Sequence, residues 1–333
     1  RLGKKSRPQV YSRTRGVLPP SVMKYSNLCM LCIISGCQSF VPSRISFTDK
    51  TASSQYRYNT IYRSVLIMDC LNPQISGLDP AKDVPTMVLI SGYPDTSDSW
   101  KRLTPHFEKT HHIIALNLPD YHKSVLSKTW GYSFPEMVTL LALAIEPHYK
   151  RGSPVHLVGH DWGSYVCQLY VRKLPDTVSK FVLLDVGKGD GKGPFLLQMS
   201  YMLWLAFSFL MSRISSTVSI LLITVYPWKI IGPTYDTNAP STIPSMKAHL
   251  AYPYAHIFRA AFKGELPDAS FESPVPQLFL YGKKKRCKYH SNSYLEYLSK
   301  QAKCDWKEFE NDGHWLHWSS HDAVSKKMKE FFA

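Results

Sequence analysis

Short apolar runs alternate with amphipathic stretches from about residue 55 to the end of the chain. The runs are made of consecutive Val, Ile and Leu residues, which is typical of strands buried on both faces of a mostly parallel sheet. The amphipathic stretches are typical of helices that cover such a sheet. We predict strands at 64–68, 87–91, 112–116, 155–158, 181–185, 277–281 and 305–310, and helices at 99–109, 134–149, 163–173, 291–303 and 321–332.

The alternation stops between residues 190 and 270, where no strand pattern occurs. Two apolar stretches in this region, 193–212 and 214–228, contain no charged residue. A membrane-spanning helix needs about 20 predominantly apolar residues, but four polar side chains interrupt the first stretch and a proline lies near the end of the second. We therefore predict a helical cap that is inserted between two strands and covers an apolar pocket. A membrane span is the alternative.

Composition supports a folded α/β chain. The 333 residues are 44% hydrophobic and 13% aromatic, which excludes a disordered or low-complexity protein. The net charge of +15 suggests a nucleic-acid or membrane-surface partner. Residues 1–48, however, carry eight basic residues and no acidic one, so the remainder carries only +7. We expect no nucleic-acid partner, and association with a membrane stays open.

The basic segment 1–48 is expected to be a leader rather than part of the fold. A basic start, a short apolar patch and a small-residue end resemble a secretory signal peptide and, more weakly, an algal plastid leader. The alternative is a disordered N-terminus on a cytoplasmic protein. The seven cysteines follow no zinc-binding spacing, so we expect free thiols and no metal site.

The strongest chemical signal is the sequence Val155-His156-Leu157-Val158-Gly159-His160-Asp161-Trp162-Gly163-Ser164. A predicted strand runs directly into a tight turn with glycines two residues on either side of Asp161. A carboxylate at the tip of such a turn can attack a saturated carbon and form an alkyl-enzyme ester. We therefore predict that Asp161 is a nucleophile.

This motif resembles the α/β-hydrolase superfamily, and within it the epoxide hydrolase and haloalkane dehalogenase branch with an aspartate nucleophile. The resemblance covers residues 60–333. It implies an α/β-hydrolase fold, a mostly parallel central sheet flanked by helices, with the core formed by 49–189 and 271–333 and the cap by 190–270. It also implies a cofactor-independent hydrolase with a catalytic triad and a small apolar or amphipathic organic substrate.

The resemblance assigns the other two members of the triad. His314, in Asn311-Asp312-Gly313-His314-Trp315, matches the general base, and His317 is its rival. Many relatives place the acid after the strand matched by 277–281, but the loop 282–288 contains four lysines, an arginine and no carboxylate. The family's second position, at the end of the strand after the nucleophile helix, is filled by Asp185. We expect the basic run 283–286 to be a solvated loop.

The resemblance also suggests an oxyanion hole and proton donors. The backbone N–H groups of Trp162 and Tyr93 match the oxyanion hole, and the Tyr93–Pro94 bond is a candidate for the cis form. Epoxide hydrolases use cap tyrosines as donors to the epoxide oxygen. Tyr254 and Tyr201 are our candidates among the five cap tyrosines, which are Tyr201, Tyr226, Tyr235, Tyr252 and Tyr254.

Three functions remain open from the sequence. The first is hydrolysis of an epoxide to a diol through an ester on Asp161, which water activated by His314 then hydrolyses. The second is haloalkane dehalogenation, which uses the same nucleophile. The third, from another class, is a catalytically degenerate α/β-hydrolase that binds an apolar ligand. Retention of both Asp161 and His314 argues against the third.

Overall fold

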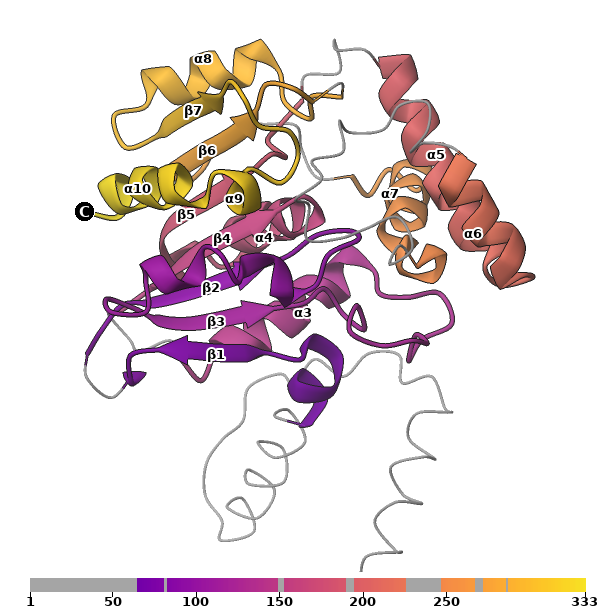
Figure 1. Cartoon of the computed structure of the whole chain (residues 1–333), viewed down its shortest axis with the longest axis horizontal. Helices are drawn as coiled ribbons and strands as arrows, with labels where there is room; N and C mark the ends of the chain where they lie inside the picture. Colours follow the sequence, from indigo (N-terminus) through magenta and orange to yellow (C-terminus); the bar gives the residue numbers. More distant parts are fainter. Residues whose placement is uncertain are drawn as a thin grey trace, which may run out of the picture. The chain divides into compact units, whose positions relative to one another are not determined.

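A seven-stranded sheet forms the centre of the protein in the computed structural model (Figure 1). The structure describes residues 65–80, 83–148, 153–189, 195–225, 247–266, 272–285 and 287–333. The leader expected at 1–48 lies outside these residues. Along the chain the strands are β1 (Gln74–Gly77), β2 (Thr86–Ile90), β3 (His112–Leu116), β4 (Val155–His160), β5 (Val178–Leu184), β6 (Gln277–Gly282) and β7 (Asp305–Phe309).

The strand order is β1-β3-β2-β4-β5-β6-β7, and every neighbouring pair is parallel except β1 with β3. In the middle of the sheet, Val88 of β2 pairs with Ile114 of β3 on one side and Leu157 of β4 on the other. All five residues of β2 are buried. The predicted class, a mostly parallel sheet between helices, is confirmed.

Helices cover both faces of this sheet. One face packs against α3 (Phe134–Ile145), α4 (Trp162–Lys173) and α8 (Asn292–Lys300), which together bury a large apolar cluster. The opposite face packs against α9 (Leu316–Ser319) and α10 (His321–Phe332). Alternate residues of β2 enter the two clusters, with Val88 on one side and Met87 on the other, because successive side chains of a strand point to opposite faces. This double burial explains the unbroken apolar runs in the sequence.

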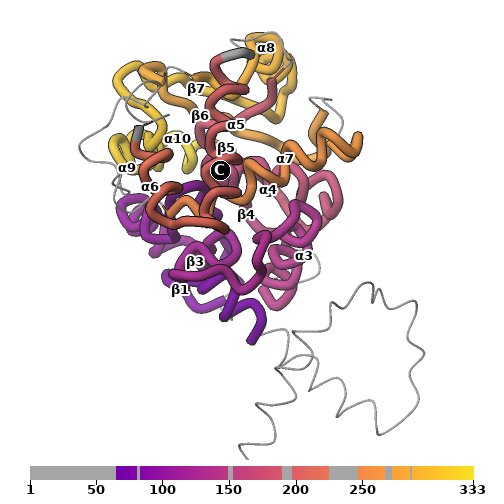
Figure 2. Tube along the Cα trace, turned by 90° about the vertical axis from the view of Figure 1, so that its right-hand side faces the viewer, coloured from indigo at the N-terminus to yellow at the C-terminus, as the bar shows by residue number. Residues whose placement is uncertain are grey.

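Three more helices lie between β5 and β6 in the chain: α5 (Phe195–Met211), α6 (Ser216–Val225) and α7 (Tyr252–Phe262). We call them the inserted helices. They lie together beyond the carboxyl ends of the parallel strands (Figures 1 and 2). None of the helices described is long and apolar enough to cross a bilayer.

Two predicted elements are wrong. Residues 65–71 are helical rather than a strand, because their apolar positions face one side: Ile67 and Leu71 are buried, whereas Val65 and Met68 are more than half exposed. The strand that begins the sheet is β1 instead. The helix predicted at 99–109 is two short 3-10 helices, η2 (Ser97–Trp100) and η3 (Thr104–His106). Pro105 lacks the N–H that a longer helix would require there.

The cysteines in the part of the chain that the structure describes are free thiols, as their spacing predicted. They are Cys70, Cys167, Cys287 and Cys304.

Candidate active site

Asp161 occupies the turn between β4 and α4. Its backbone has φ 54° and ψ −123°, a conformation that is costly for a residue with a side chain and is found mainly at functional sites. The turn needs glycine at the two flanking positions. A Cβ on Gly163 would lie 2.2 Å from the Ile90 carbonyl oxygen of β2, and one on Gly159 would lie 2.7 Å from the backbone of Gly163. The glycines therefore let α4 begin directly against the sheet.

Two backbone N–H groups donate to the Asp161 carboxylate. The Tyr93 N–H donates to Oδ1 over 2.9 Å, and the Trp162 N–H also donates to the carboxylate. The loop after β2 can approach this closely because residue 92 is a glycine, whose Cβ would lie 2.5 Å from Asp161 Oδ1. The Tyr93–Pro94 bond is cis, as its position suggested. Both residues named for the oxyanion hole thus face the carboxylate of Asp161.

His314 lies between Asp161 and Asp185. Its Nδ1 is hydrogen-bonded to Asp185 Oδ2, and its Nε2 lies 3.6 Å from Asp161 Oδ2. Because a carboxylate only accepts, Nδ1 carries the hydrogen of this bond, and Nε2 is the ring nitrogen that faces Asp161. Asp185 directly follows β5, and its side chain is 1% exposed. Three residues that the sequence separates by up to 153 positions therefore lie together, joined by one hydrogen bond and one contact at 3.6 Å.

A second histidine supports the segment that carries His314. The ring of His160, the residue before Asp161, is fully buried, with its centroid 4.5 Å from that of His314. Its Nε2 donates to the His314 carbonyl oxygen over 3.0 Å. Burial holds the pKa of His160 well below its ordinary value, so the ring is neutral. The sequence analysis assigned His160 no role, since a histidine inside a motif gives no sign of its contacts.

Lys285 was also missed. It belongs to the basic run after β6 that we expected to be solvated, yet it is only 8% exposed and its ammonium group pairs with Asp185 Oδ2. The ammonium also contacts the Asp185 carbonyl oxygen at 3.3 Å and lies 4.3 Å from the ring centroid of Tyr289. The expectation is wrong for Lys285 and holds for Lys283 and Lys284, which are exposed. Arg286 lies outside the described residues.

The surroundings shift the pKa values of the two carboxyl groups in opposite directions. Burial raises the pKa of Asp161, although His314 and the N–H groups of Trp162 and Tyr93 oppose that rise. Burial acts the same way on Asp185, but there the Lys285 ammonium and His314 outweigh it and lower the pKa of the carboxyl. Asp185 is therefore the firmly ionised partner of His314. The less well stabilised charge belongs to Asp161, which makes it the better nucleophile.

Tyr201 of α5 and Tyr254 of α7 face this group from the inserted helices. Their hydroxyl oxygens lie 3.4 Å apart, and the Tyr254 ring packs edge-on against Trp162 at 4.9 Å. Burial raises the pKa of both hydroxyls, and the nearby Asp161 charge adds to that rise. Both groups therefore stay protonated and can donate a hydrogen bond.

The remaining candidates do not join the group. The Tyr252 hydroxyl donates to the Pro119 carbonyl oxygen over 2.9 Å, so Tyr252 packs the fold. Tyr226 and Tyr235 lie outside the described residues. The His317 ring is fully buried against Trp100, at 4.7 Å, and against His160 on its other side. Within the described structure it makes no hydrogen bond, and His314 alone contacts both carboxylates.

Comparison with known proteins agrees with this architecture. Residues 85–219 match the family model described as alpha/beta hydrolase fold. The uncharacterized hydrolase YugF of Bacillus subtilis (strain 168) is 30% identical over 99 residues, which are 30% of this chain and 36% of that protein. Epoxide hydrolase 2 of Caenorhabditis elegans is 27% identical over 106 residues, 31% of this chain and 29% of that one. The chain thus matches about a third of the length of each relative.

Solved structures resemble a larger share of the chain. A putative lipase from Acinetobacter baumannii AYE has a TM-score of 0.59 at 19% identity, over 88% of this chain and 98% of its own. An epoxide hydrolase from Bacillus megaterium, solved in complex with an inhibitor, has a TM-score of 0.58 at 17% identity, over 79% of this chain and 96% of its own. At such identities the likeness shows the fold alone.

Proposed function

The chain has the α/β-hydrolase fold, and from this premise we propose that it hydrolyses epoxides to diols through an ester on Asp161. The substrate is a small apolar or amphipathic organic epoxide, and no step requires a cofactor. The inserted helices act as the cap that excludes water and supplies proton donors. An epoxide hydrolase among the curated relatives supports this reaction over others that the fold hosts.

In the first half-reaction, Asp161 Oδ2 attacks an epoxide carbon and the carbon–oxygen bond of the ring breaks. The oxygen that leaves that carbon takes a proton from a tyrosine hydroxyl, Tyr254 or Tyr201, while the carbon becomes esterified to Asp161. The paired hydroxyls at 3.4 Å and their burial support this role.

In the second half-reaction, His314 Nε2 removes a proton from a water molecule that attacks the ester carbonyl carbon. Negative charge develops on Oδ1, to which the Tyr93 N–H donates, and the Trp162 N–H donates to the same carboxyl group. Asp185 accepts from Nδ1 and stabilises the imidazolium that forms. When the intermediate collapses, the bond from the Asp161 carboxyl carbon to Oδ2 breaks, and Oδ2 leaves as a hydroxyl of the diol with the second hydrogen of the water. The Asp161 carboxylate is restored with one oxygen from that water, and the proton on His314 returns to the tyrosine.

One observation carries this proposal: the two oxygens of Asp161 have different surroundings. Oδ1 accepts a hydrogen bond from the Tyr93 N–H, whereas Oδ2 faces His314 Nε2 at 3.6 Å. A residue that only capped α4 would need no histidine base beside its second oxygen. A nucleophile needs one oxygen to attack and the other to carry the oxyanion.

Heavy-oxygen labelling tests the ester. Full-length enzyme in excess over styrene oxide, allowed a single turnover in heavy-oxygen water, should give a diol without label and a peptide containing Asp161 with one labelled oxygen. Direct attack by water would instead place the label in the diol and would contradict the proposal.

Trapping the ester tests the base. His314→Gln should accumulate a mass adduct on Asp161, and the control His314→Gln/Asp161→Asn should accumulate none. If neither turnover nor adduct appears across a broad panel of epoxides, the protein is a binder of apolar ligands and the proposal fails.

Haloalkane dehalogenation is a second candidate, because the buried indole N–H of Trp162 has no hydrogen-bond partner within the described structure. A donor beside the nucleophile can stabilise a leaving halide. Release of bromide from bromoalkanes, with no diol formed from epoxides, would favour this function. If Trp162→Phe loses bromide release but keeps epoxide turnover, the Trp162 indole N–H stabilises the halide and has no part in epoxide hydrolysis.

A further inference from the structure

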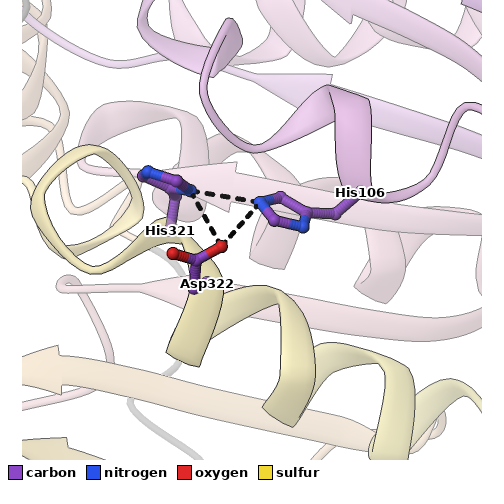
Figure 3. Close-up of side chains that lie close together, drawn as sticks. All are labelled: His106, His321 and Asp322. Atoms are coloured by element: carbon purple, nitrogen blue, oxygen red, sulfur yellow. Dashed lines mark hydrogen bonds and ion pairs between the residues drawn. The ribbon is translucent and has the colours of Figure 1, made fainter.

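A second group of potential ligands lies where η3 meets the start of α10, outside the group around Asp161. His106 ends η3, and His321 and Asp322 begin α10. Figure 3 shows the three side chains pointing toward one another. One nitrogen from each ring and one carboxylate oxygen converge, all within 4.8 Å of one another. The spacing of the cysteines predicted no metal site, and the 215 positions between His106 and His321 hide their proximity from the sequence.

The three ligand atoms form a nearly regular triangle. His106 Nε2 lies 3.1 Å from His321 Nδ1 and 3.4 Å from Asp322 Oδ1, and the latter two atoms are 3.6 Å apart. A tetrahedral metal with bonds of about 2.05 Å holds its ligand atoms about 3.3 Å apart. Neighbouring ligands of an octahedral metal at about 2.1 Å lie about 3.0 Å apart. The observed spacing fits the tetrahedral case better.

The same triangle leaves room for the ion itself. A point about 2.05 Å from all three atoms lies about 0.6 Å out of their plane, close to the ~0.7 Å of a regular tetrahedral centre. Hydrogen bonding accounts for the arrangement less well. With both rings neutral, the carboxylate and the ring nitrogen that accepts from the other ring contribute lone pairs only, so the three atoms share at most one hydrogen. A cation between them satisfies all three lone pairs at once.

Exposure gives a metal ion access. The two histidine side chains are 25% and 30% exposed, and that of Asp322 is 83% exposed. An ion could therefore enter without unfolding and keep water as its fourth ligand. Two imidazoles and a carboxylate are a donor set that suits Zn²⁺.

We propose that His106, His321 and Asp322 bind one Zn²⁺ ion in a tetrahedral site completed by water. The ion joins η3 to α10, two segments that pack on the same face of the sheet. It is separate from the proposed hydrolysis, which uses none of these residues.

Zinc titration tests the site. Full-length protein freed of metal, titrated with Zn²⁺ against a chromophoric chelator, should bind one ion that the triple variant H106Q/H321Q/D322N does not bind. His106→Gln alone should weaken the zinc affinity about 100-fold or more, since it removes one of three protein ligands.

Thermal unfolding gives a second test. Zn²⁺ should raise the melting temperature of the wild type and leave that of the triple variant unchanged. His256→Gln serves as the matched control, because the His256 Nε2 is hydrogen-bonded to the Trp130 carbonyl oxygen and the residue lies outside the proposed site.

Substitution by Co²⁺ shows whether the bound ion has histidine and carboxylate ligands or cysteine thiolate ligands. Co²⁺ in place of Zn²⁺ should give the visible bands of a tetrahedral ion without a thiolate charge-transfer band, and the triple variant should lose those bands. Equal zinc affinity and equal cobalt spectra in the wild type and the triple variant would overturn the proposal. Octahedral cobalt spectra would overturn its geometry.

Discussion

At the scale of single residues, the unusual feature is a carboxylate oxygen that accepts from two side chains. Asp185 Oδ2 accepts from both His314 Nδ1 and the Lys285 ammonium. The lysine comes from the loop where many relatives carry the triad acid, so this chain has a cation where they have a carboxylate. The buried Lys285 ammonium is the largest influence that lowers the pKa of Asp185, and it keeps that carboxylate ionised.

We predict that Lys285→Met moves the acidic limb of the kcat/KM profile to higher pH, by about one pH unit. Without the ammonium, the pKa of Asp185 rises, and the carboxylate that orients His314 is protonated earlier as the pH falls. Lys283→Met is the control, because Lys283 pairs at the exposed surface with Glu310 over 2.6 Å. Identical profiles for the wild type and a folded Lys285→Met would show that Lys285 only packs.

We predict that Asp161→Asn abolishes turnover and raises the melting temperature at pH 7 by a few degrees. Because folding raises the pKa of Asp161, its contribution to stability is complete at low pH and is lost as the pH rises through that pKa. Asparagine carries no charge at neutral pH, yet its oxygen can still accept from the Tyr93 N–H. Thermal unfolding at pH 7 measures the difference, and a lower melting temperature would contradict this reasoning.

At the scale of elements, the site depends on how closely α4 approaches β2. That approach is set by Gly163, where even one methyl group would meet the Ile90 carbonyl oxygen. The sequence pattern predicted β2 to β7, α3, α4, α8 and α10. It could do so because apolar residues form continuous runs in strands buried on both faces, whereas they recur every three or four positions in amphipathic helices. The pattern failed at 65–71. A run of only four apolar residues is compatible with a strand or with a turn of helix, and packing against other elements decides between them.

We predict that Gly163→Ala destabilises the protein by about 1–3 kcal/mol or more, because the added Cβ overlaps backbone atoms that cannot move independently. Gly189→Ala should be nearly neutral, since a Cβ there meets no atom within 4 Å. Urea unfolding of the two variants, compared with the wild type, measures both effects. Equal midpoints for the two variants would mean that the turn adapts more readily than its packing implies.

At the scale of the whole molecule, several histidines of the described residues are buried or half-buried and neutral at pH 7. Burial lowers the pKa of His111 and His290 to about 4, that of His156 and His317 to about 3, and that of His160 well below its ordinary value. In the unfolded chain each would titrate near pH 6.5. Between pH 7 and pH 4 the unfolded state therefore binds more protons than the folded state.

We predict that stability falls steadily as the pH is lowered from 7 to 4, by up to about 1.4 kcal/mol per pH unit for each such histidine. His156→Gln should make this dependence shallower. The His156 ring packs on Phe332 at 4.2 Å and is hydrogen-bonded to His111, so the substitution also removes contacts that stabilise the fold. The test therefore compares the slope of stability against pH in the two proteins and not their stability at one pH. Melting temperatures in a pH series provide the slopes, and an unchanged slope in His156→Gln would contradict the assignment.

The sequence by itself determined the sheet and the tight turn that carries the Asp161 carboxylate. Unbroken apolar runs require burial on both faces, and a carboxylate between two spaced glycines requires a tight turn; both are local properties that neighbouring residues encode. Only the tertiary structure decided which distant groups surround that carboxylate. Asp185 and His314 could be named in advance through a resemblance, but the burial of Lys285 and the meeting of His106 with His321 depend on how remote segments pack. Local sequence patterns carry no record of such packing, because contacts between distant residues arise only when the elements assemble.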